Sequence, residues 1–388
     1  MTGGLIAISV WLGQPCRGGE AAVTPPARID LAARVAEQLD RAGGNRAELE
    51  QALAAAPDED ERYGLQFLIA HMPEPDLQSL SAKYLLANSS LAWQARRELP
   101  WGPAIPERIF LNDVLPYANI DEQRDDWRAE MHELCLPIVK DLRAPAAAAH
   151  RLNLELFRKL NLGYSTQRRA ANQGPAESIA SGKASCTGLS IVLADACRSV
   201  CIPARLVGTP LWANKRGNHT WVEIWDGGWH FTGACEADPQ GLDRGWFVAS
   251  AAEARADSFE HAIYAASFAR TDVYFPLPWA IHNTSVPAEN VTARYAVGEP
   301  RTGTAVRLLV RVVDAAGERV PRDVRVFRPG SAEPFCTGRS RGETSDRNDI
   351  VSFEVPPGEE LSVRVDEITT SVRCAADRPE TVLDVRVP

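Results

Sequence analysis

A cysteine and a histidine stand in sequence surroundings that favour nucleophilic catalysis. Cys186 follows the glycine-containing loop 182–185, at the point where an apolar helical pattern begins, and His219 begins an alternating stretch typical of a β-strand. A helix N-terminus and a nearby imidazole both lower the pKa of a thiol, and the thiolate is the reactive form. The two residues together indicate a thiol nucleophile with its base. The alternative is a buried structural cysteine beside an unrelated histidine.

A carboxylate can reach this pair from the strand that follows His219. Residues 226–228 (Asp-Gly-Gly) predict a hairpin turn and residues 229–232 its second strand, so the chain returns alongside His219. Glu236 and Asp238 are the acids that follow this strand. A carboxylate that accepts a hydrogen bond from an imidazole orients the ring and stabilises its charged form. Glu236 is the favoured candidate, because it lies nearer the strand and has the longer side chain, and Asp238 is the second.

Four segments, in this order, resemble the transglutaminase-like superfamily. They are Ala184-Ser185-Cys186, Ile202-Pro203-Ala204-Arg205, His219-Thr220-Trp221-Val222-Glu223 and Gly228-Trp229. The resemblance implies a papain-like α+β core with Cys186 and His219 as catalytic residues. The activities it implies are transglutamination, peptide hydrolysis and deglycosylation of asparagine-linked glycopeptides.

The resemblance also implies a third catalytic residue that this chain lacks. The family has an aspartate four residues after the tryptophan of the second hairpin strand, and this chain has Gly233 there. Either Glu236 or Asp238 replaces that aspartate, or the domain has become a binding module without activity. The favoured function is cysteine-dependent acyl transfer at an amide, with hydrolysis of a peptide or related amide as the main reaction and glycopeptide amidase activity as a further alternative.

The residues next to the catalytic pair are the expected substrate contacts. They are Ser185, Thr187 and Trp221. The reaction requires no cofactor, and the cysteines lack the paired spacing of a metal site. A formal net charge of −9 argues against a nucleic-acid partner. The expected partner is therefore a peptide, protein or glycopeptide substrate.

A chain of 388 residues with 45% hydrophobic residues is expected to form two or three folded domains. Apolar residues at helical spacing predict a helical N-terminal region over 28–99, followed by the transglutaminase-like core over 100–286. Short alternating segments separated by Gly, Pro and Asp predict a C-terminal all-β sandwich over 287–388, similar to immunoglobulin, fibronectin or carboxypeptidase-regulatory modules. The fold class is therefore α+β with an added β-sandwich.

The first 27 residues contain an apolar run, 5–12, followed by small residues. This pattern resembles a signal peptide and predicts export to the periplasm or outside the cell, with the cytoplasm as the alternative. The run is too short to span a bilayer, and no other segment approaches that length. In an exported protein, Cys336 and Cys374 are candidates for a disulfide.

Overall fold

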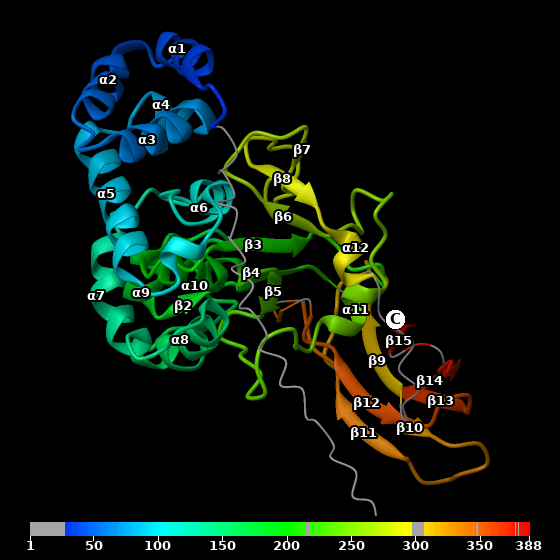
Figure 1. The fold of residues 1–388 in the computed structure, drawn as a ribbon. Helices are drawn as coiled ribbons and strands as arrows, with labels where there is room; N and C mark the ends of the chain where they lie inside the picture. Colours follow the sequence, from blue (N-terminus) through cyan, green and yellow to red (C-terminus); the bar gives the residue numbers. More distant parts are fainter. Residues whose placement is uncertain are drawn as a thin grey trace, which may run out of the picture.

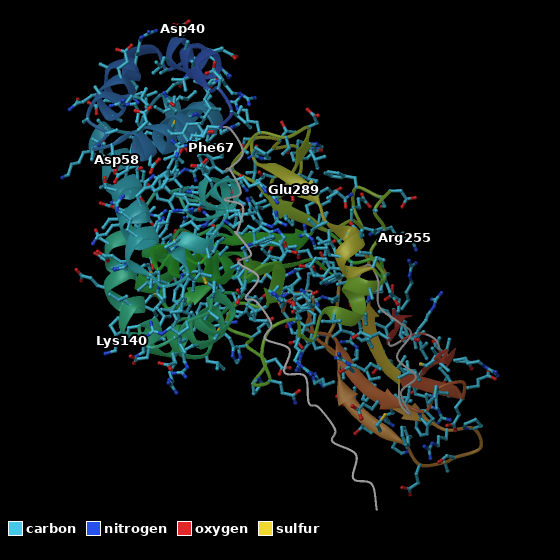
Figure 2. All side chains as sticks on the ribbon, viewed as in Figure 1. Asp40, Asp58, Phe67, Lys140, Arg255 and Glu289 are labelled. Carbon is cyan, nitrogen blue, oxygen red and sulfur yellow. The ribbon has the colours of Figure 1, made fainter. Side chains whose placement is uncertain are left out.

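The computed structural model describes residues 28–214, 217–296, 306–343, 345–346, 348–376, 378 and 380–388. The expected signal peptide lies outside the described residues. Figure 1 shows a group of helices followed by a mixed α/β region and then by a set of β-strands, coloured from blue to red along the chain. In Figure 2, the charged side chains of Asp40, Asp58 and Lys140 lie on the outer surface. No helix in the described part of the chain is long and apolar enough to cross a membrane.

The N-terminal region is helical, as the apolar spacing predicts. Side-chain caps fix two of its helix starts, where Asp58 accepts from the N–H of Glu61 and Ser81 accepts from the N–H of Tyr84. The apolar side chains of these helices form one continuous core with those of the following region. The elements are α1 (Ala32–Arg41), η1 (Gly43–Asn45), α2 (Arg46–Ala54), α3 (Glu59–His71), α4 (Glu74–Leu77) and α5 (Ala82–Glu98).

The next region is a helical layer against a six-stranded sheet. Its helices and first short strands are η2 (Gly102–Ala104), α6 (Glu107–Asp113), α7 (Arg128–Val139), α8 (Pro145–Lys159), β1 (Gly163–Tyr164), α9 (Pro175–Ser181), β2 (Lys183–Ala184) and α10 (Cys186–Ser199). The sheet has the order β5-β4-β3-β6-β8-β7. Its members and the two short helices beside it are β3 (Ala204–Thr209), β4 (His219–Trp225), β5 (Trp229–Thr232), α11 (Val248–Ala252), β6 (Tyr264–Ala266), β7 (Val273–Tyr274), β8 (Pro287–Asn290) and α12 (Thr292–Tyr295). Helix α10 packs against β3 and β4 and is buried from its second residue to its last.

The register of β3 and β4 explains two of the sequence motifs. Arg205 pairs with Glu223 across the antiparallel ladder, and a guanidinium nitrogen lies 2.8 Å from the carboxylate of Glu223. Arg294 and the hydroxyl of Tyr295 also donate to this carboxylate. A buried charge is tolerated when it is paired and hydrogen-bonded. The Ile-Pro-Ala-Arg and His-x-Trp-x-Glu segments are therefore neighbours that share a buried ion pair.

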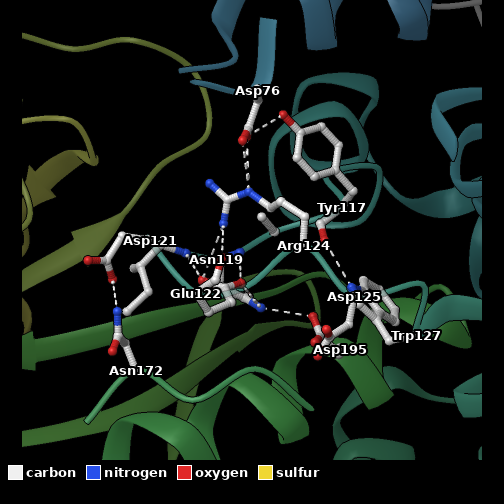
Figure 3. A network of polar contacts seen from close by, with 12 residues as sticks. Asp76, Tyr117, Asn119, Asp121, Glu122, Arg124, Asp125, Trp127, Asn172 and Asp195 are labelled. Atoms are coloured by element: carbon white, nitrogen blue, oxygen red, sulfur yellow. Dashed lines mark hydrogen bonds and ion pairs between the residues drawn. The ribbon is translucent and has the colours of Figure 1, made fainter. Parts of the chain in front are cut away.

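A buried polar network joins the N-terminal helices to α10 (Figure 3). Asp76 of α4 accepts hydrogen bonds from the hydroxyl of Tyr117, at 2.8 Å, and from Arg124, at 3.0 Å. Asn119, two residues beyond Tyr117, donates to Asp195 of α10 at 2.8 Å. Burial and the charge of Glu122 hold the pKa of Asp195 well above its usual range. The helical N-terminal region is thus coupled to the helix that begins with Cys186.

The C-terminal region forms the expected sandwich of two sheets around its own apolar core. The first sheet has the order β11-β10-β13-β14 and the second the order β12-β9-β15, in which β15 runs parallel to β9. Neither Cys336 nor Cys374 is in a disulfide. The strands are β9 (Val306–Val313), β10 (Asp323–Phe327), β11 (Cys336–Arg339), β12 (Val351–Val355), β13 (Glu360–Val365), β14 (Ile368–Arg373) and β15 (Glu380–Arg386).

The core sheet extends beyond the boundary at 287 that composition predicts. Strand β8 pairs with β6 and β7, and Tyr295 of α12 bonds to Trp221 and Glu223 inside the core. The first strand of the sandwich begins only at Val306. The segment 287–296 therefore lies with the central region.

A chain that ends at residue 296 should consequently unfold at a higher temperature than one that ends at residue 286. The shorter chain loses β8 and leaves one edge of β6 unpaired. It also removes Arg294 and Tyr295 from the buried carboxylate of Glu223, which keeps only Arg205, and a buried charge that loses part of its hydrogen bonding is destabilising. Thermal unfolding of chains 28–296 and 28–286, followed by circular dichroism, compares the two. Equal midpoints would contradict the assignment of 287–296 to the core.

Candidate active site

Cys186 is the first residue of α10 and lies where the helix leaves its loop. Gly182 ends α9 in a left-handed conformation, with φ of 66°, which glycine adopts without strain. Ser185 caps α10 by accepting a hydrogen bond from the N–H of Gly188 at 2.9 Å. The N–H groups of the first turn point toward the cysteine end of the helix, and their partial positive charge favours an anion there. The local sequence therefore places a thiol in an anion-stabilising position.

Strand β4 brings His219 to this thiol. Two contacts fix the helix against the strand: the hydroxyls of Thr187 and Thr220 lie 2.9 Å apart, and the hydroxyl of Ser190 donates to the carbonyl of Thr220 at 3.2 Å. The His219 ring is then within hydrogen-bonding reach of the Cys186 sulfur. Both residues line one cavity. The structure thus brings Cys186 and His219 together, as the sequence predicts.

Aromatic rings enclose His219 and limit the orientations available to it. The side chain is only 3% exposed. Its ring centroid lies 4.7 Å from that of Trp246, 5.0 Å from that of Phe247 and 5.9 Å from that of Trp221. Trp212 stacks on the other face of this group, 6.1 Å from Trp221. This packing holds the imidazole in place and keeps water away from most of the ring.

The electrostatics of the pair favour a thiolate beside an imidazolium. Burial raises the pKa of Cys186. The hydrogen bond and charge of His219 and the N–H of Thr220 lower it by a larger amount, so the pKa lies below the ordinary thiol value. Burial lowers the pKa of His219, yet the hydrogen bonds and charges of Cys186 and Glu236 raise it to about 9. In the other described cysteines, burial raises the thiol pKa; these are Cys135, Cys197, Cys201, Cys235, Cys336 and Cys374.

Glu236 lies beside the imidazole of His219. One carboxylate oxygen is 3.5 Å from Nε2 of His219, an ion-pair distance at the long limit of hydrogen bonding. The same oxygen accepts a hydrogen bond of 2.7 Å from the indole N–H of Trp246. Contacts of this length are common in catalytic sites without substrate. The favoured sequence candidate for the acid is therefore beside the ring.

The position of Glu236 also explains the glycine at 233. A Cβ atom added to Gly233 would lie 2.6 Å from the carboxylate oxygen of Glu236 and 3.1 Å from its Cβ. Distances of this size are repulsive, so a side chain at 233 would require the carboxylate of Glu236 to move away from its present place beside His219. The carboxylate of Glu236 therefore fills the space into which an aspartate at 233 would project.

Asn153 of α8 shapes the turn that carries Glu236. Its side-chain amide donates to the hydroxyl of Thr232 and to the carbonyl of Gly233, and its oxygen accepts from the N–H of Cys235. Cys235 has a positive φ of 64°, which is unusual for a residue with a side chain, and the amide of Asn153 holds it there. The signal in the sequence was a polar residue on the otherwise apolar face of α8, between Leu152 and Leu156.

Asp238 is not beside the histidine, which corrects the second acid candidate. Its backbone carbonyl bonds to Nε2 of His150, and its carboxylate accepts from the N–H of Gln240. It is also not among the residues that line the cavity. The chain reverses at Cys235, so Glu236 lies beside His219, and two residues later the backbone of Asp238 contacts His150 of α8.

The three expected substrate contacts are also corrected by the structure. Ser185, Thr187 and Trp221 are each at most 2% exposed, and none lines the cavity. Ser185 caps α10, Thr187 binds Thr220, and Trp221 is stacked under other rings. Their side chains build the site from behind and do not face a substrate.

The cavity beside Cys186 has a volume of about 580 Å³ and is lined by segments that are far apart in the sequence. One wall comes from the loop before α9, at residues 164–167. The other comes from Trp246 and from the segment between β11 and β12 of the sandwich, at Ser345, Asp346, Asn348 and Asp349. Sequence reasoning missed these sandwich residues, because they reach the site only through tertiary packing. No set of three or more metal-ligating side chains is arranged for a metal ion in the described part of the chain.

The comparison with protein families agrees with this arrangement. Residues 133–249, which include Cys186, His219 and Glu236, match the family model of the transglutaminase-like superfamily. This central part of the chain is therefore similar to the transglutaminase-like superfamily, and it stands between a helical N-terminal region and a C-terminal sandwich.

Among solved structures, the chain is similar to one named "a Putative Cysteine Protease from Cytophaga hutchinsonii", with 17% identity and a TM-score of 0.25. The similarity covers 30% of this chain and 40% of that protein, so it spans less than half of the other protein's length. The chain has no significant match among curated proteins.

We predict that Cys186 reacts with iodoacetamide at neutral pH faster than the other cysteines do. Its rate should reach half of its maximum at a pH below the ordinary thiol pKa. In His219→Asn, burial remains while the contributions that lower the thiol pKa are lost, so the midpoint should rise and the rate at pH 7 should fall by about tenfold or more. Mass spectrometry of each cysteine over a pH series measures this. A midpoint that does not move would contradict activation by His219.

We also predict that Asn153→Leu destabilises the fold and slows alkylation of Cys186. The substitution leaves the hydroxyl of Thr232, the carbonyl of Gly233 and the N–H of Cys235 without their partner, at about 1–3 kcal/mol for each group that water does not reach. Urea unfolding and Cys186 alkylation are the two measurements. Leu154→Ala, on the exposed face of the same helix, is the control and should change neither.

Proposed function

We propose that this chain is a cysteine hydrolase that cleaves an amide bond, with a peptide or a related amide as substrate. The observation that carries the proposal is the set of three groups around one cavity: a thiol with a lowered pKa, an imidazole with a raised pKa and a carboxylate beside the imidazole. Together they supply a nucleophile, a proton carrier and a group that stabilises the proton carrier.

In the first half of the reaction, the thiolate of Cys186 attacks the carbonyl carbon and forms a carbon–sulfur bond. The carbonyl electrons move to oxygen, and the backbone N–H of Cys186, at the start of α10, is placed to donate to that oxyanion. When the intermediate collapses, the C–N bond breaks. The imidazolium of His219 gives its proton to the departing amine, which leaves a thioester on Cys186 and a neutral imidazole.

In the second half, water replaces the amine. Neutral His219 removes a proton from water as the oxygen attacks the thioester carbon, and the C–S bond then breaks. The products are a carboxylic acid and the regenerated thiolate–imidazolium pair. An amine that attacks in place of water would give transfer instead of hydrolysis through the same thioester, so the ratio of the two reactions depends on which nucleophile enters the cleft.

Glu236 is the proposed orienting acid. Its carboxylate contributes to the raised pKa of His219, and the indole of Trp246 fixes one of its oxygens. In a domain that had lost its catalytic acid, no function would require a carboxylate in the space next to Gly233. This compensation favours an active enzyme over a binding module.

A peptide vinyl sulfone tests the assignment of nucleophile and acid together. The Cys186 sulfur forms a bond to the vinyl carbon β to the sulfonyl group of the reagent, and the imidazolium of His219 gives a proton to the α-carbon. We expect one modification in the wild type and none in Cys186→Ala. The rate should fall on the alkaline side with a midpoint of about pH 9, where His219 loses its proton. Labelling that persists in Cys186→Ala would overturn the proposal.

Loss of the Glu236 carboxylate should slow this reaction by at least about a hundredfold, since wrong-tautomer losses in related triads are larger still. In Glu236→Gln, the alkaline midpoint should also move to lower pH, because one contribution that raises the pKa of His219 is gone. Asp238→Asn, which carries the same change of charge two residues away, should behave as the wild type. Equal rates in the Glu236→Gln variant and the wild type would show that another group orients His219.

The exclusion between positions 233 and 236 predicts a rescue. Gly233→Asp alone should be inactive, because the new side chain collides with Glu236 and brings a like charge to it. Glu236→Gly alone should be inactive, because no carboxylate then orients His219. The double variant removes the collision and the like charge and places a carboxylate at 233, so it should regain at least about tenfold over Glu236→Gly. No gain in the vinyl sulfone rate would count against the compensation.

A further inference from the structure

The C-terminal sandwich reaches the proposed active site through Ser345, Asp346, Asn348 and Asp349, between β11 and β12, and Asn348 contacts the start of β4 (Figure 1). Arg319, a buried residue of the sandwich, donates to the carbonyls of Ser345 and Asp346 and so holds this segment in its projecting shape. The hydroxyl of Tyr164, on the opposite wall of the cavity, donates to the carboxylate of Asp346. The segment is thus supported from the sandwich and attached to the core.

Asn348 makes the contact that bears on catalysis. Its side-chain N–H donates to the carbonyl of Asn218 at 2.6 Å, and Asn218 immediately precedes His219. Its side-chain oxygen accepts from the indole N–H of Trp212 at 3.1 Å. The indole N–H can only donate and the carbonyl can only accept, so these partners fix the orientation of the amide.

Both partners of Asn348 control the position of the catalytic ring. The Asn218 carbonyl belongs to the peptide unit whose nitrogen is that of His219, so it helps to set the backbone at the start of β4. The ring of Trp212 lies 6.4 Å from that of His219 and stacks on Trp221 beneath it. Trp212 is only 1% exposed, and its indole N–H requires a partner when buried. One amide therefore acts on His219 through the backbone and through its aromatic neighbour.

We infer that Asn348 of the sandwich is a positioning residue for His219 and that the sandwich completes the active site. This inference rests on the proposed function, since it concerns the same Cys186–His219 pair. An amide is required at this position, because it donates and accepts at once. Aspartate keeps the acceptor for Trp212 but has no donor for the Asn218 carbonyl, and alanine has neither.

The test is alkylation of the full-length protein by iodoacetamide over a pH series, with Cys235 as an internal reference. Cys235 is exposed and has no role in the proposed reaction. In Asn348→Asp, which loses one hydrogen bond, the ratio of Cys186 to Cys235 rates at pH 7 should fall by about tenfold. In Asn348→Ala, which loses both hydrogen bonds, it should fall by at least as much. The midpoint for Cys186 should rise by about one pH unit, because a displaced His219 no longer stabilises the thiolate.

Two controls separate positioning from a general loss of stability. Glu333→Gln changes an exposed residue of the loop between β10 and β11, whereas the cavity residues follow the other end of β11. It should leave the ratio of Cys186 to Cys235 rates and the pH midpoint of Cys186 unchanged. Trp212→Phe removes only one of the two partners, so combining it with Asn348→Ala should cost less than the sum of the single changes. Loss of stability alone would not move the pH midpoint of Cys186.

The outcomes distinguish the two proposals. If Cys186 of the wild type reacts no faster than Cys235, the proposed function fails, whatever the Asn348 variants do. If the wild-type thiol is activated and both Asn348 variants keep its rate and midpoint, the inference about the sandwich is overturned and the proposed function stands. If Asn348→Ala does not fold, Asn348→Asp decides the question.

Discussion

The contact between α10 and β4 is the constraint on which the site depends. A thiolate and an imidazolium stabilise each other only at hydrogen-bonding distance, and here they come from a helix start and a strand start. The Thr187–Thr220 and Ser190–Thr220 hydrogen bonds set that distance by fixing how far the helix is displaced along the strand. A helix buried along almost its whole length cannot shift to relieve a poor contact. The surrounding core, including the network around Asp195, therefore holds α10 at one position along β4.

The acid of the site obeys a different constraint. The thiol and the imidazole are tied to the ends of regular elements, whereas the carboxylate needs only to reach one edge of the imidazole ring. Several backbone positions can satisfy that condition, provided the space between is empty. Glycine at 233 leaves the space empty, and a longer side chain three residues later fills it. The freedom of this third position follows from geometry, since a side chain of one more methylene can start from a more distant Cα.

Much of the fold and part of the site could be predicted from the sequence, because both rest on local patterns. The helix start at Cys186, the strand at His219 and the hairpin that returns Glu236 follow from side-chain periodicity and turn residues. The structure buries Ser185 and Trp221, two expected substrate contacts, outside the cavity lining, because closeness in sequence does not reveal which side chains other residues cover. The rings that bury Trp221 come from residues that no local pattern links to it. Asn348 could not be predicted either, since it reaches Asn218 only after the sandwich has packed on the core.

Two asparagines, Asn153 and Asn348, have the same role: each binds backbone of the site that regular secondary structure supports least. His219 stands at the end of a strand, and Glu236 stands beyond one, so neither backbone is held on both sides by a sheet. In each case an amide from another part of the chain binds the backbone next to the catalytic residue, at Gly233 and Cys235 in one and at Asn218 in the other. An amide suits this task because it donates and accepts from a short side chain and carries no charge that would disturb the ion pair. The helix α8 and the sandwich are therefore attached to the backbone beside Glu236 and His219 through neutral hydrogen bonds, and these two contacts add no charge to the cavity.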